Sequence, residues 1–499
     1  MKWLAYIAFL ALALSTNAQD VDEQIDQSFF WPKSSKTHIA KPEKGSTQID
    51  LLPKPSTLQF KPSISYALSG GVSSKKNAQA LSTAYLNTGF ELKKRNLSLK
   101  LRAEVLQGEF GNYMSDFIDS TGVISGFSVA TRNDLGYLAH RITGNVNWQI
   151  SRHFNAEIGN SAHFWGNGHR SLVLGNNAAP YPYLKLTTDV WRIKYVNLFS
   201  QQRDFNETLE LNDAQSKYTA LHAIDFKVSE SFSLTLFEAV VWQSSDTLSN
   251  RGFEANYLNP IIFYRPVEFS QGSADNVLLG LAGRLQLEEH FLWYGQMFLD
   301  EFLLSAVREG SGWWANKVGL QIGVQAKNYV EGLTAYSEFN LARPFTYTHG
   351  SARQSYGHLN QSLAHPLGTN FMEWSSGAEF NVKKWRCAAR FNWAFYGRDR
   401  DGDNYGGNVF RSYASPLKPF GNYIGQGNTH HSYFGHVNVM RPLTRKKRLW
   451  MSLGYVVRHV KNSFNTHTEH QFRLGLASNM SSLLSRNRDV YVPNFVQDF

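Results

Sequence analysis

Hydrophobic and polar residues alternate along most of this chain, in segments of roughly ten residues. The segment 142–150 reads ITGNVNWQI, which places Ile142, Val146 and Trp148 on one side of an extended strand. A short polar stretch follows, and the alternation resumes at Phe154. This pattern predicts two antiparallel strands that are joined by a tight turn.

The same arrangement of two alternating segments around a short polar turn recurs along the chain. The predicted strand pairs lie at 218–228 and 232–242, 277–287 and 291–299, 318–326 and 329–341, 378–382 and 385–395, and 436–440 and 449–457. Long polar connections lie near residues 108–135, 163–183, 243–276, 342–370 and 398–430.

This asymmetry, with short turns on one side and long loops on the other, is typical of an outer-membrane β-barrel. A soluble β-sandwich also has alternating strands, but it rarely needs so many strands with such long loops. Counting candidate strands gives about 14 to 18, and an even number is expected for a bacterial barrel. The predicted fold class is therefore all-β, a transmembrane antiparallel up-and-down barrel with long extracellular loops.

The first residues predict export from the cytoplasm. Lys2 precedes an apolar run from Trp3 to Leu14, and residues 1–18 have the pattern of a signal peptide that ends at Ala18. The run is shorter than the ~20 residues that a membrane-spanning helix needs. Residues 19–57 are predicted to be a flexible periplasmic leader, and residues 58–499 to form the barrel.

Composition agrees with a barrel that has one apolar and one polar face. Aromatic residues make up 14% of the chain, yet the mean hydropathy is only −0.36. The net charge of +10 is dispersed, and no helix–turn–helix or zinc pattern accompanies it, so nucleic acid is not an expected partner. Basic residues that line a lumen or meet anionic glycan and lipid phosphate fit better. The single cysteine, Cys387, excludes an intramolecular disulfide.

Segment 163–183, HFWGNGHRSLVLGNNAAPYPY, combines glycines with aromatic, amide and basic side chains. Proteins hold sugars with such groups, because an aromatic face stacks on the sugar ring while amides and guanidinium groups bond its hydroxyls or acidic substituents. The candidate carbohydrate-binding residues are Trp165, Asn167, His169, Arg170, Asn176 and Asn177. The alternative interpretation is a loop folded into the barrel to maintain its shape.

Arg265 and Glu268 are candidates for a charge pair across the lumen. Glycoside hydrolysis normally uses two carboxylates, and no second one is evidently placed with Glu268, so packing is the preferred interpretation. The chain also lacks HExxH, GxSxG, Walker A and CxxC motifs. Enzymatic activity is therefore not expected.

Asp399, Asp401 and Asp403 alternate like the start of a calcium-binding loop. Asn404 and Phe410, however, stand where such a loop requires Gly and Glu, so an EF-hand is excluded. Calcium in a looser loop and an acidic surface turn both stay open, and no other cofactor is expected.

Three segments resemble the Wzi capsule-assembly family of outer-membrane proteins, and within it the gliding-motility RemB branch of Bacteroidetes. They are FWGNGHRSLVLGNNAAPYPYLKLTTDVW from Phe164, NPIIFYRPVEFSQGSADNVLLGL from Asn259 and AHPLGTNFMEW from Ala364. The resemblance extends from about residue 58 to the end. Capsule-type members tend to carry Pro where Asn167 stands, and they have a helical periplasmic bundle that residues 19–57 do not predict.

The resemblance implies an 18-stranded barrel in the bacterial outer membrane, with no known enzymatic activity. It also implies a lectin-like role in which the protein binds exported polysaccharide and holds it at the cell surface. The gliding branch adds surface motility, with gliding or secretion machinery as a further partner beside outer-membrane lipid. The alternative hypothesis is a diffusion channel, because a barrel of this size can leave a polar lumen unless loops fill it.

Overall fold

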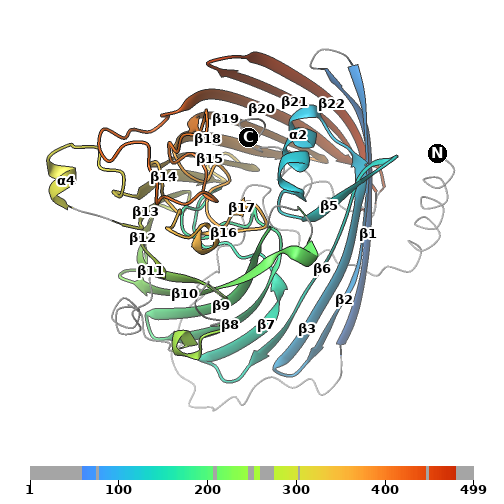
Figure 1. Ribbon diagram of the computed structural model, residues 1–499. Coiled ribbons are helices and arrows are strands. Elements are labelled where there is room, and N and C mark those ends of the chain that lie inside the picture. The colour runs from blue at the N-terminus through green and yellow to red at the C-terminus, as the bar shows by residue number, and fades with distance from the viewer. Residues whose placement is uncertain are drawn as a thin grey trace.

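The computed structural model describes residues 59–74, 78–205, 209, 211–244, 252–258, 275–301, 304–444 and 449–478. Among these residues, 18 strands form one closed antiparallel barrel (Figure 1). Each barrel strand pairs with the next one along the chain, and β1 pairs with β22 so that Ala67 lies opposite Ala477. Closure leaves no unpaired sheet edge, which a barrel in lipid requires.

The barrel strands are β1 (Gln59–Ser74), β2 (Ala78–Lys94), β3 (Leu97–Glu109), β6 (Gly136–Gln149), β7 (Phe154–Ser161), β8 (Tyr181–Val190), β9 (Ile193–Asp204), β10 (Gln215–Lys227), β11 (Phe232–Gln243), β12 (Asn276–Leu287), β13 (Phe291–Leu299), β14 (Val318–Lys327), β15 (Leu333–Ala342), β18 (Phe371–Val382), β19 (Trp385–Arg398), β20 (Asn428–Pro442), β21 (Trp450–Asn462) and β22 (Thr466–Ala477).

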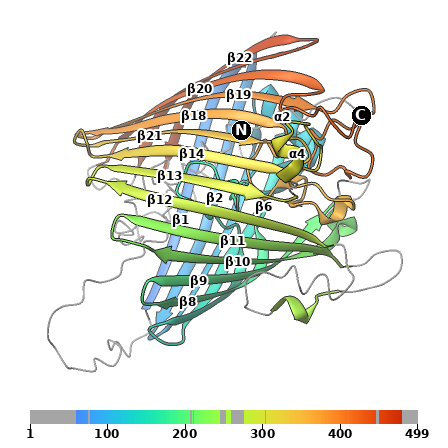
Figure 2. The same cartoon turned by 90° about the vertical axis from the view of Figure 1, so that its left-hand side faces the viewer.

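The remaining elements lie in the connections between barrel strands. They are α2 (Asn112–Thr121), β4 (Val123–Ile124), β5 (Ser128–Asn133), η3 (Leu211–Asp213), η4 (Ala255–Leu258), α4 (Leu304–Arg308), η5 (Ala352–Gln354), β16 (Gly357–His358) and β17 (Gln361–Ser362). Figure 2 shows α2 and α4 at the same end of the barrel. None of the described helices has the length and apolar character of a membrane span.

The strands form where the alternation predicts them, because each strand faces two different environments. On β14, Leu320 and Ile322 are 44% and 56% exposed on the outside, whereas Gln321 between them is 1% exposed and points inward. Other outward apolar side chains include Leu101, Val105, Ile142, Val146, Trp293, Met297, Trp374, Leu453 and Phe472. An apolar outer surface around a closed barrel is the structure of a protein embedded in the bacterial outer membrane.

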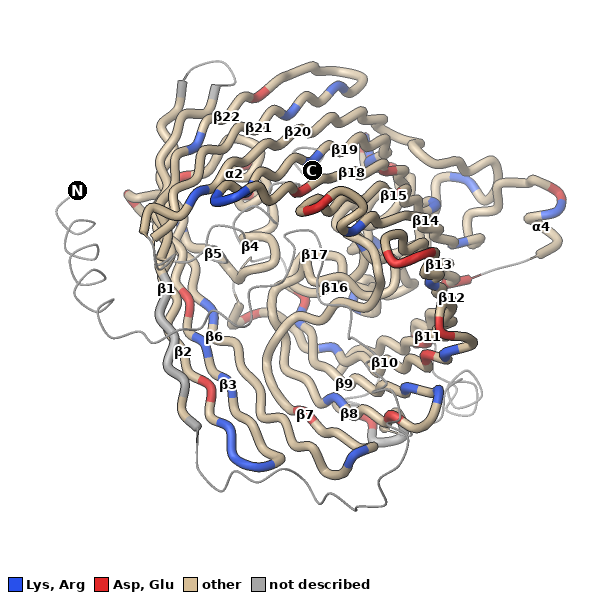
Figure 3. Tube along the Cα trace, turned by 180° about the vertical axis from the view of Figure 1, so that it is seen from behind, with Lys and Arg blue, Asp and Glu red and all other residues tan. Residues whose placement is uncertain are grey.

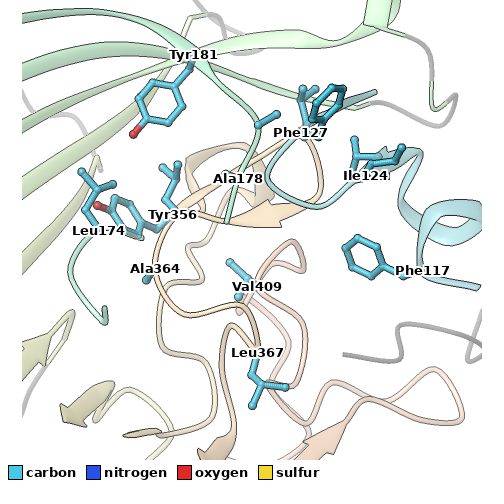
Figure 4. Packing of buried hydrophobic residues seen from close by; sticks show 14 of the residues in the cluster. Phe117, Ile124, Phe127, Leu174, Ala178, Tyr181, Tyr356, Ala364, Leu367 and Val409 are labelled. Atoms are coloured by element: carbon cyan, nitrogen blue, oxygen red, sulfur yellow. The ribbon is translucent and has the colours of Figure 1, made fainter. Parts of the chain in front are cut away.

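Much of the hydrophobic core lies in connections that fold into the barrel. We call the connections 110–135, 162–180, 343–370 and 399–427 the loop plug. Its buried apolar members include Phe117, Ile124, Phe127, Leu174, Ala178, Tyr356, Ala364, Leu367 and Val409, which pack together in Figure 4. Figure 1 shows β16 and β17 inside the ring of strands, so the plug occupies the lumen.

Helix α2 attaches the plug to the closing strands of the barrel. Glu469 on β22 accepts hydrogen bonds from the backbone N–H groups of Asn112 at 2.9 Å and Tyr113 at 3.2 Å. A carboxylate is favourable at a helix N-terminus, where N–H groups lack partners within the helix. The guanidinium of Arg458 on β21 lies 5.0 Å from the centre of the Tyr113 ring.

The structure confirms the antiparallel barrel and the predicted strand pairs, but some bounds differ, since β18 begins at Phe371 rather than at residue 378 and β20 at Asn428 rather than at residue 436. Strand β15 begins at Leu333 rather than at Tyr329, because Asn328 and Gly332 adopt positive φ angles of 53° and 76° and lengthen the turn. Helix α2 was not predicted within 108–135, although its buried residues Tyr113, Met114, Phe117, Ile118 and Thr121 have helical spacing.

Figure 3 shows charged residues scattered over strands and loops, in agreement with the dispersed charge of the sequence. The predicted signal peptide and leader lie outside the described residues, as do residues 445–448 between the predicted strands 436–440 and 449–457.

Candidate functional site

Segment 162–180 leaves the wall after β7 and folds back into the lumen before β8 begins. The N–H of Trp165 donates to the carbonyl of Leu174 at 2.9 Å and closes the fold-back. The hydroxyl of Ser171 donates to the carbonyl of Trp165 at 2.6 Å. A Cβ at Gly168 would lie 2.5 Å from Glu338 Oε2, so the backbone approaches the wall this closely only with glycine here.

Glu338 on β15 anchors this segment. Its carboxylate accepts the backbone N–H groups of His169 at 2.8 Å and Arg170 at 2.9 Å, and the hydroxyl of Tyr294 at 2.8 Å. Asn340 Nδ2 also donates to it at 3.0 Å, and these four donors satisfy a carboxylate that would otherwise be costly to bury.

Inward-facing glutamines on neighbouring strands satisfy more of the segment's backbone. Gln296 on β13 accepts the N–H of Leu172 at 2.8 Å, and Gln321 on β14 donates to the carbonyl of Arg170 at 2.9 Å. Gln325 donates to the carbonyl of Asn167. These contacts replace the strand hydrogen bonds that a loop in the lumen lacks.

A second buried carboxylate, Glu373 on β18, binds the Arg170 side chain. Arg170 Nε lies 3.5 Å from Glu373 Oε2, and His365 Nε2 lies 2.6 Å from the same oxygen. Burial lowers the pKa of His365 even beside this carboxylate, so the neutral ring donates its N–H to Glu373. The segments that begin at Phe164 and Ala364, two of the three that carry the family resemblance, thus meet in the lumen.

The structure gives the first four candidate carbohydrate-binding residues contacts with the barrel wall. Arg170 pairs with Glu373, and the carbonyl of Asn167 accepts from Gln325. Trp165 meets the Phe237 ring edge-on at 5.9 Å, and the His169 ring lies 5.0 Å from that of Tyr336. These contacts fit the alternative of a shape-maintaining loop, and a role in sugar binding stays a prediction.

Asn176 and Asn177 lie further along the segment and are half-buried. Asn177 lines a cleft where the four connections of the loop plug meet, on the side of the long loops. This outer cleft is narrow, since the space in it that the centre of a water-sized molecule can occupy is about 20 Å³. It is lined among others by Phe117, Asn177, Asn360, Gln361, Arg398 and Phe410. Sequence reasoning missed all of these except Asn177, because they come from connections that are far apart along the chain.

Arg265 and Glu268 lie outside the described residues, so their pairing stays a prediction.

The three aspartates of the calcium hypothesis are not gathered around one point. Asp399 accepts the N–H groups of Tyr405 and Gly407 at 2.9 and 3.0 Å, and Asp401 pairs with Arg400 at 3.3 Å with 77% of its side chain exposed. The part of the chain that the structure describes contains no group of three or more His, Cys, Asp or Glu placed to hold a metal. Calcium binding stays a prediction.

The fold and the plugged lumen define an outer-membrane β-barrel. No protein-family model and no curated protein matches the chain. Among solved structures it is similar to Wzi, an outer-membrane protein involved in group 1 capsule assembly in Escherichia coli and a carbohydrate-binding β-barrel. The TM-score is 0.53 and the identity 13%, over 83% of this chain and 84% of Wzi. The chain therefore has a Wzi-like barrel fold.

Other solved structures have lower TM-scores against the chain. OccK8 (OprE) of Pseudomonas aeruginosa has a TM-score of 0.44 and 9% identity, over 84% of this chain and 98% of that one. OccAB2 of Acinetobacter baumannii has a TM-score of 0.45 and 10% identity, over 83% and 97%.

Proposed function

We propose that this protein binds exported polysaccharide at the cell surface and holds it there without transforming it. The observation that carries the proposal is the outer cleft, where aromatic and amide side chains from four connections converge with the guanidinium of Arg398 at the end of β19. This is the set of groups that proteins use to bind sugars. The likeness of the fold to Wzi, a carbohydrate-binding barrel, supports the same function.

Binding without catalysis is supported by the state of the two carboxylates that hold segment 162–180. Glu338 and Glu373 are 2% and 0% exposed, and each is occupied by several donors from the segment or the wall. A glycosidase needs a pair of carboxylates that reach the substrate and can exchange protons. These two carboxylates instead hold a loop in place.

The loop plug supports binding over diffusion through an open channel. The hydroxyls of Tyr347 and Tyr356 donate to the carbonyls of Leu172 and Val173, both at 2.8 Å, and so join the connections 343–370 and 162–180. Lys217 on β10 donates to the carbonyl of Ser355 at 2.8 Å and so joins the connection 343–370 to the wall. Connections that are hydrogen-bonded to each other and to the wall restrict passage through the lumen.

The second part of the proposal concerns the process in the cell that this polysaccharide binding serves. The sequence resemblance to the gliding-motility branch favours a role in organising surface glycan for motility, with gliding or secretion machinery as partner. Capsule or exopolysaccharide attachment is the other form of the same function. Loss of gliding with normal glycan retention in a deletion strain would favour the first, and the reverse result the second.

The direct test is binding of the purified, detergent-folded protein to polysaccharide extracted from the surface of its own source cells. We expect saturable binding that an unrelated barrel in the same detergent does not show. Absence of binding to every surface glycan fraction would contradict the proposal. Trp165→Ala then tests the segment 162–180 separately, since normal binding by a folded variant would leave this segment with a structural role alone.

A further inference from the structure

Two segments on the long-loop side, residues 304–314 and 417–423, join to form an arm that we call the outer arm. Backbone hydrogen bonds connect them, among them the bond from the N–H of Asn422 to the carbonyl of Gly312 at 2.9 Å. A Cβ at Gly312 would lie 2.8 Å from the backbone nitrogen of Asn422, so the two segments approach this closely only with glycine here. The outer arm is therefore a defined structural unit rather than two separate loops.

The outer arm projects sideways from the barrel. In Figure 1, which looks into the ring of strands, α4 lies outside the ring. Figure 2 shows α4 level with the ends of the strands on the side of the long loops. A segment that lies outside the wall at this level lies over the lipid that surrounds the barrel, where the acyl chains meet the headgroups.

The connection that carries α4 leaves the wall where the lipid-facing surface ends. Met297 on β13 and Leu320 on β14 are paired neighbours, and they are 38% and 44% exposed on the outside of the barrel. Two residues further along, Leu299 and Val318 form the last pair of these strands. Because each strand residue advances the chain by about 3.3 Å, the connection begins roughly 7 Å from side chains that face lipid. The outer arm thus continues an apolar surface that already contacts the membrane.

The outer arm exposes large apolar side chains. Their exposed fractions lie between 46% and 61%, for Leu304, Val307, Leu417, Phe420 and Tyr423. Exposed apolar surface of this kind indicates a contact with another molecule or with a membrane. The position of the arm beside the lipid-facing wall favours the membrane.

The charged residues of the outer arm fit the headgroup layer of a membrane. Its two basic residues are Arg308, which is exposed in the last turn of α4, and Lys418, whose Nζ lies 5.6 Å from the centre of the Tyr423 ring. Its one acidic residue is Glu309. Basic side chains with apolar stems reach phosphate groups from an apolar surface, and tyrosine rings are enriched at membrane interfaces.

We propose that the outer arm lies on the outer leaflet of the membrane and anchors the extracellular side of the protein there. In this arrangement Val307 and Phe420 contact the boundary between headgroups and acyl chains, as the apolar face of an interfacial helix does. Residues 417–423 belong to the connection 399–427, so the arm joins the loop plug to the membrane surface. The inference goes beyond polysaccharide binding and does not depend on it.

The test measures contact with lipid at single labelled positions of the whole protein. Cys387→Ala first removes the native free thiol. A fluorophore is then attached at Val307→Cys or at Phe420→Cys, and the protein is folded into vesicles of phosphatidylcholine and phosphatidylglycerol. In a second set of vesicles, part of the lipid carries bromine near the headgroup end of its acyl chains. We expect both labels to lose fluorescence in the brominated vesicles, because bromine quenches only the fluorophores that it contacts.

Two further positions calibrate the quenching. Leu320→Cys places the label on the lipid-facing side of β14, where brominated lipid should quench it. Arg353→Cys places it on η5 in the loop plug, at an exposed position just before β16, where the lipid should not reach it. Folding of every variant is checked by its mobility shift on heating in gel electrophoresis.

The pattern over the four positions decides the inference. Quenching at 307 and 420 that resembles quenching at 320 would support the anchor. Labels at 307 and 420 that behave like the label at 353 in the folded protein would overturn it. Fluorescence changes at 307 and 420 that appear only when surface polysaccharide is added would also overturn it, because the arm would then contact glycan rather than lipid. The polysaccharide-binding function is tested separately, with the unlabelled wild type in detergent.

Discussion

Single inward-facing carboxylates determine how segment 162–180 lies in the lumen. Glu338 accepts two consecutive backbone N–H groups, and Glu373 forms an ion pair with the Arg170 side chain and accepts from His365. The two contacts differ in kind, because the first is made to the main chain and the second depends on one side chain. Only the second can be removed by a point substitution in the segment.

We therefore expect Arg170→Met to destabilise the folded barrel by about 3 kcal/mol, because removal of one partner leaves a buried charge uncompensated. The measurement is the midpoint of urea unfolding in lipid vesicles, followed by tryptophan fluorescence. Lys227→Met is the matched control, since Lys227 pairs with Glu230, which is 91% exposed, and such surface pairs contribute about 0–1 kcal/mol. Equal midpoints for the two variants would contradict the anchoring role of Glu373.

At the scale of elements, the connections of the loop plug contain several buried neutral histidines. Burial lowers the pKa of His358 on β16 to about 3, of His163 to about 3 and of His349 to about 4, from an ordinary value of 6.5. Asp300, just beyond β13, shifts in the opposite direction, since burial raises its pKa to about 7.

These shifts predict that the loop plug loosens in acid. A lowered histidine pKa means that the unfolded state binds the proton more readily than the folded state does. Each such histidine therefore lowers the free energy of unfolding by about 1.4 kcal/mol per pH unit below 6.5, until the pH reaches its pKa in the folded state. Asp300 opposes this trend. Its raised pKa stabilises the folded state at low pH, and this contribution is lost as the pH rises to about 7. Three histidines outweigh one aspartate.

Hydrogen exchange between pH 7 and pH 4 checks this expectation, after correction for the intrinsic pH dependence of exchange. Protection of the backbone in 345–365 should fall with pH, while protection of the barrel strands changes little. His358→Gln, which can still accept the N–H that Arg203 now donates to His358 Nδ1 at 2.9 Å, should reduce the pH dependence. Unchanged protection of the plug at pH 4 would show that these histidines do not control it.

For the molecule as a whole, the closed wall and the filled lumen determine what can cross it. We expect the wild type in planar bilayers to carry no large steady current, because polar and apolar contacts join the connections to each other and to the wall. Replacing residues 345–369 by a short Gly-Ser linker should increase the conductance at least severalfold, because wide barrels conduct when their loops are removed. A large steady wild-type current would favour the diffusion channel instead.

The barrel could be predicted from the sequence because strand alternation is a local property. Leu320, Gln321 and Ile322 occupy one short segment, and their order alone says which side chains face lipid and which face the lumen. The pairing of sequential strands follows from the short turns between them. Boundaries were less certain where a turn contained several residues, as at Asn328 and Gly332.

The candidate site was predicted only in part, and for a different physical reason. Segment 163–183 was correctly singled out as unusual, but its sequence alone does not tell whether Arg170 meets a sugar or a buried carboxylate. Glu373 lies about two hundred residues away along the chain, and only closure of the barrel brings it within 3.5 Å. The outer cleft depends in the same way on Gln361 and on Gly126, which belong to different connections.

The sequence by itself thus determined the class of protein, its alternating strands and the uneven lengths of its connections, because these depend on neighbours within about ten residues. The tertiary structure alone decided which polar side chains serve the architecture and which are left to meet a ligand. The reason is that a buried polar group is satisfied or unsatisfied only through partners that folding brings from elsewhere in the chain. Arg170, held by Glu373, is of the first kind, and Gln361, whose Nε2 has no hydrogen-bond partner among the described residues, is of the second.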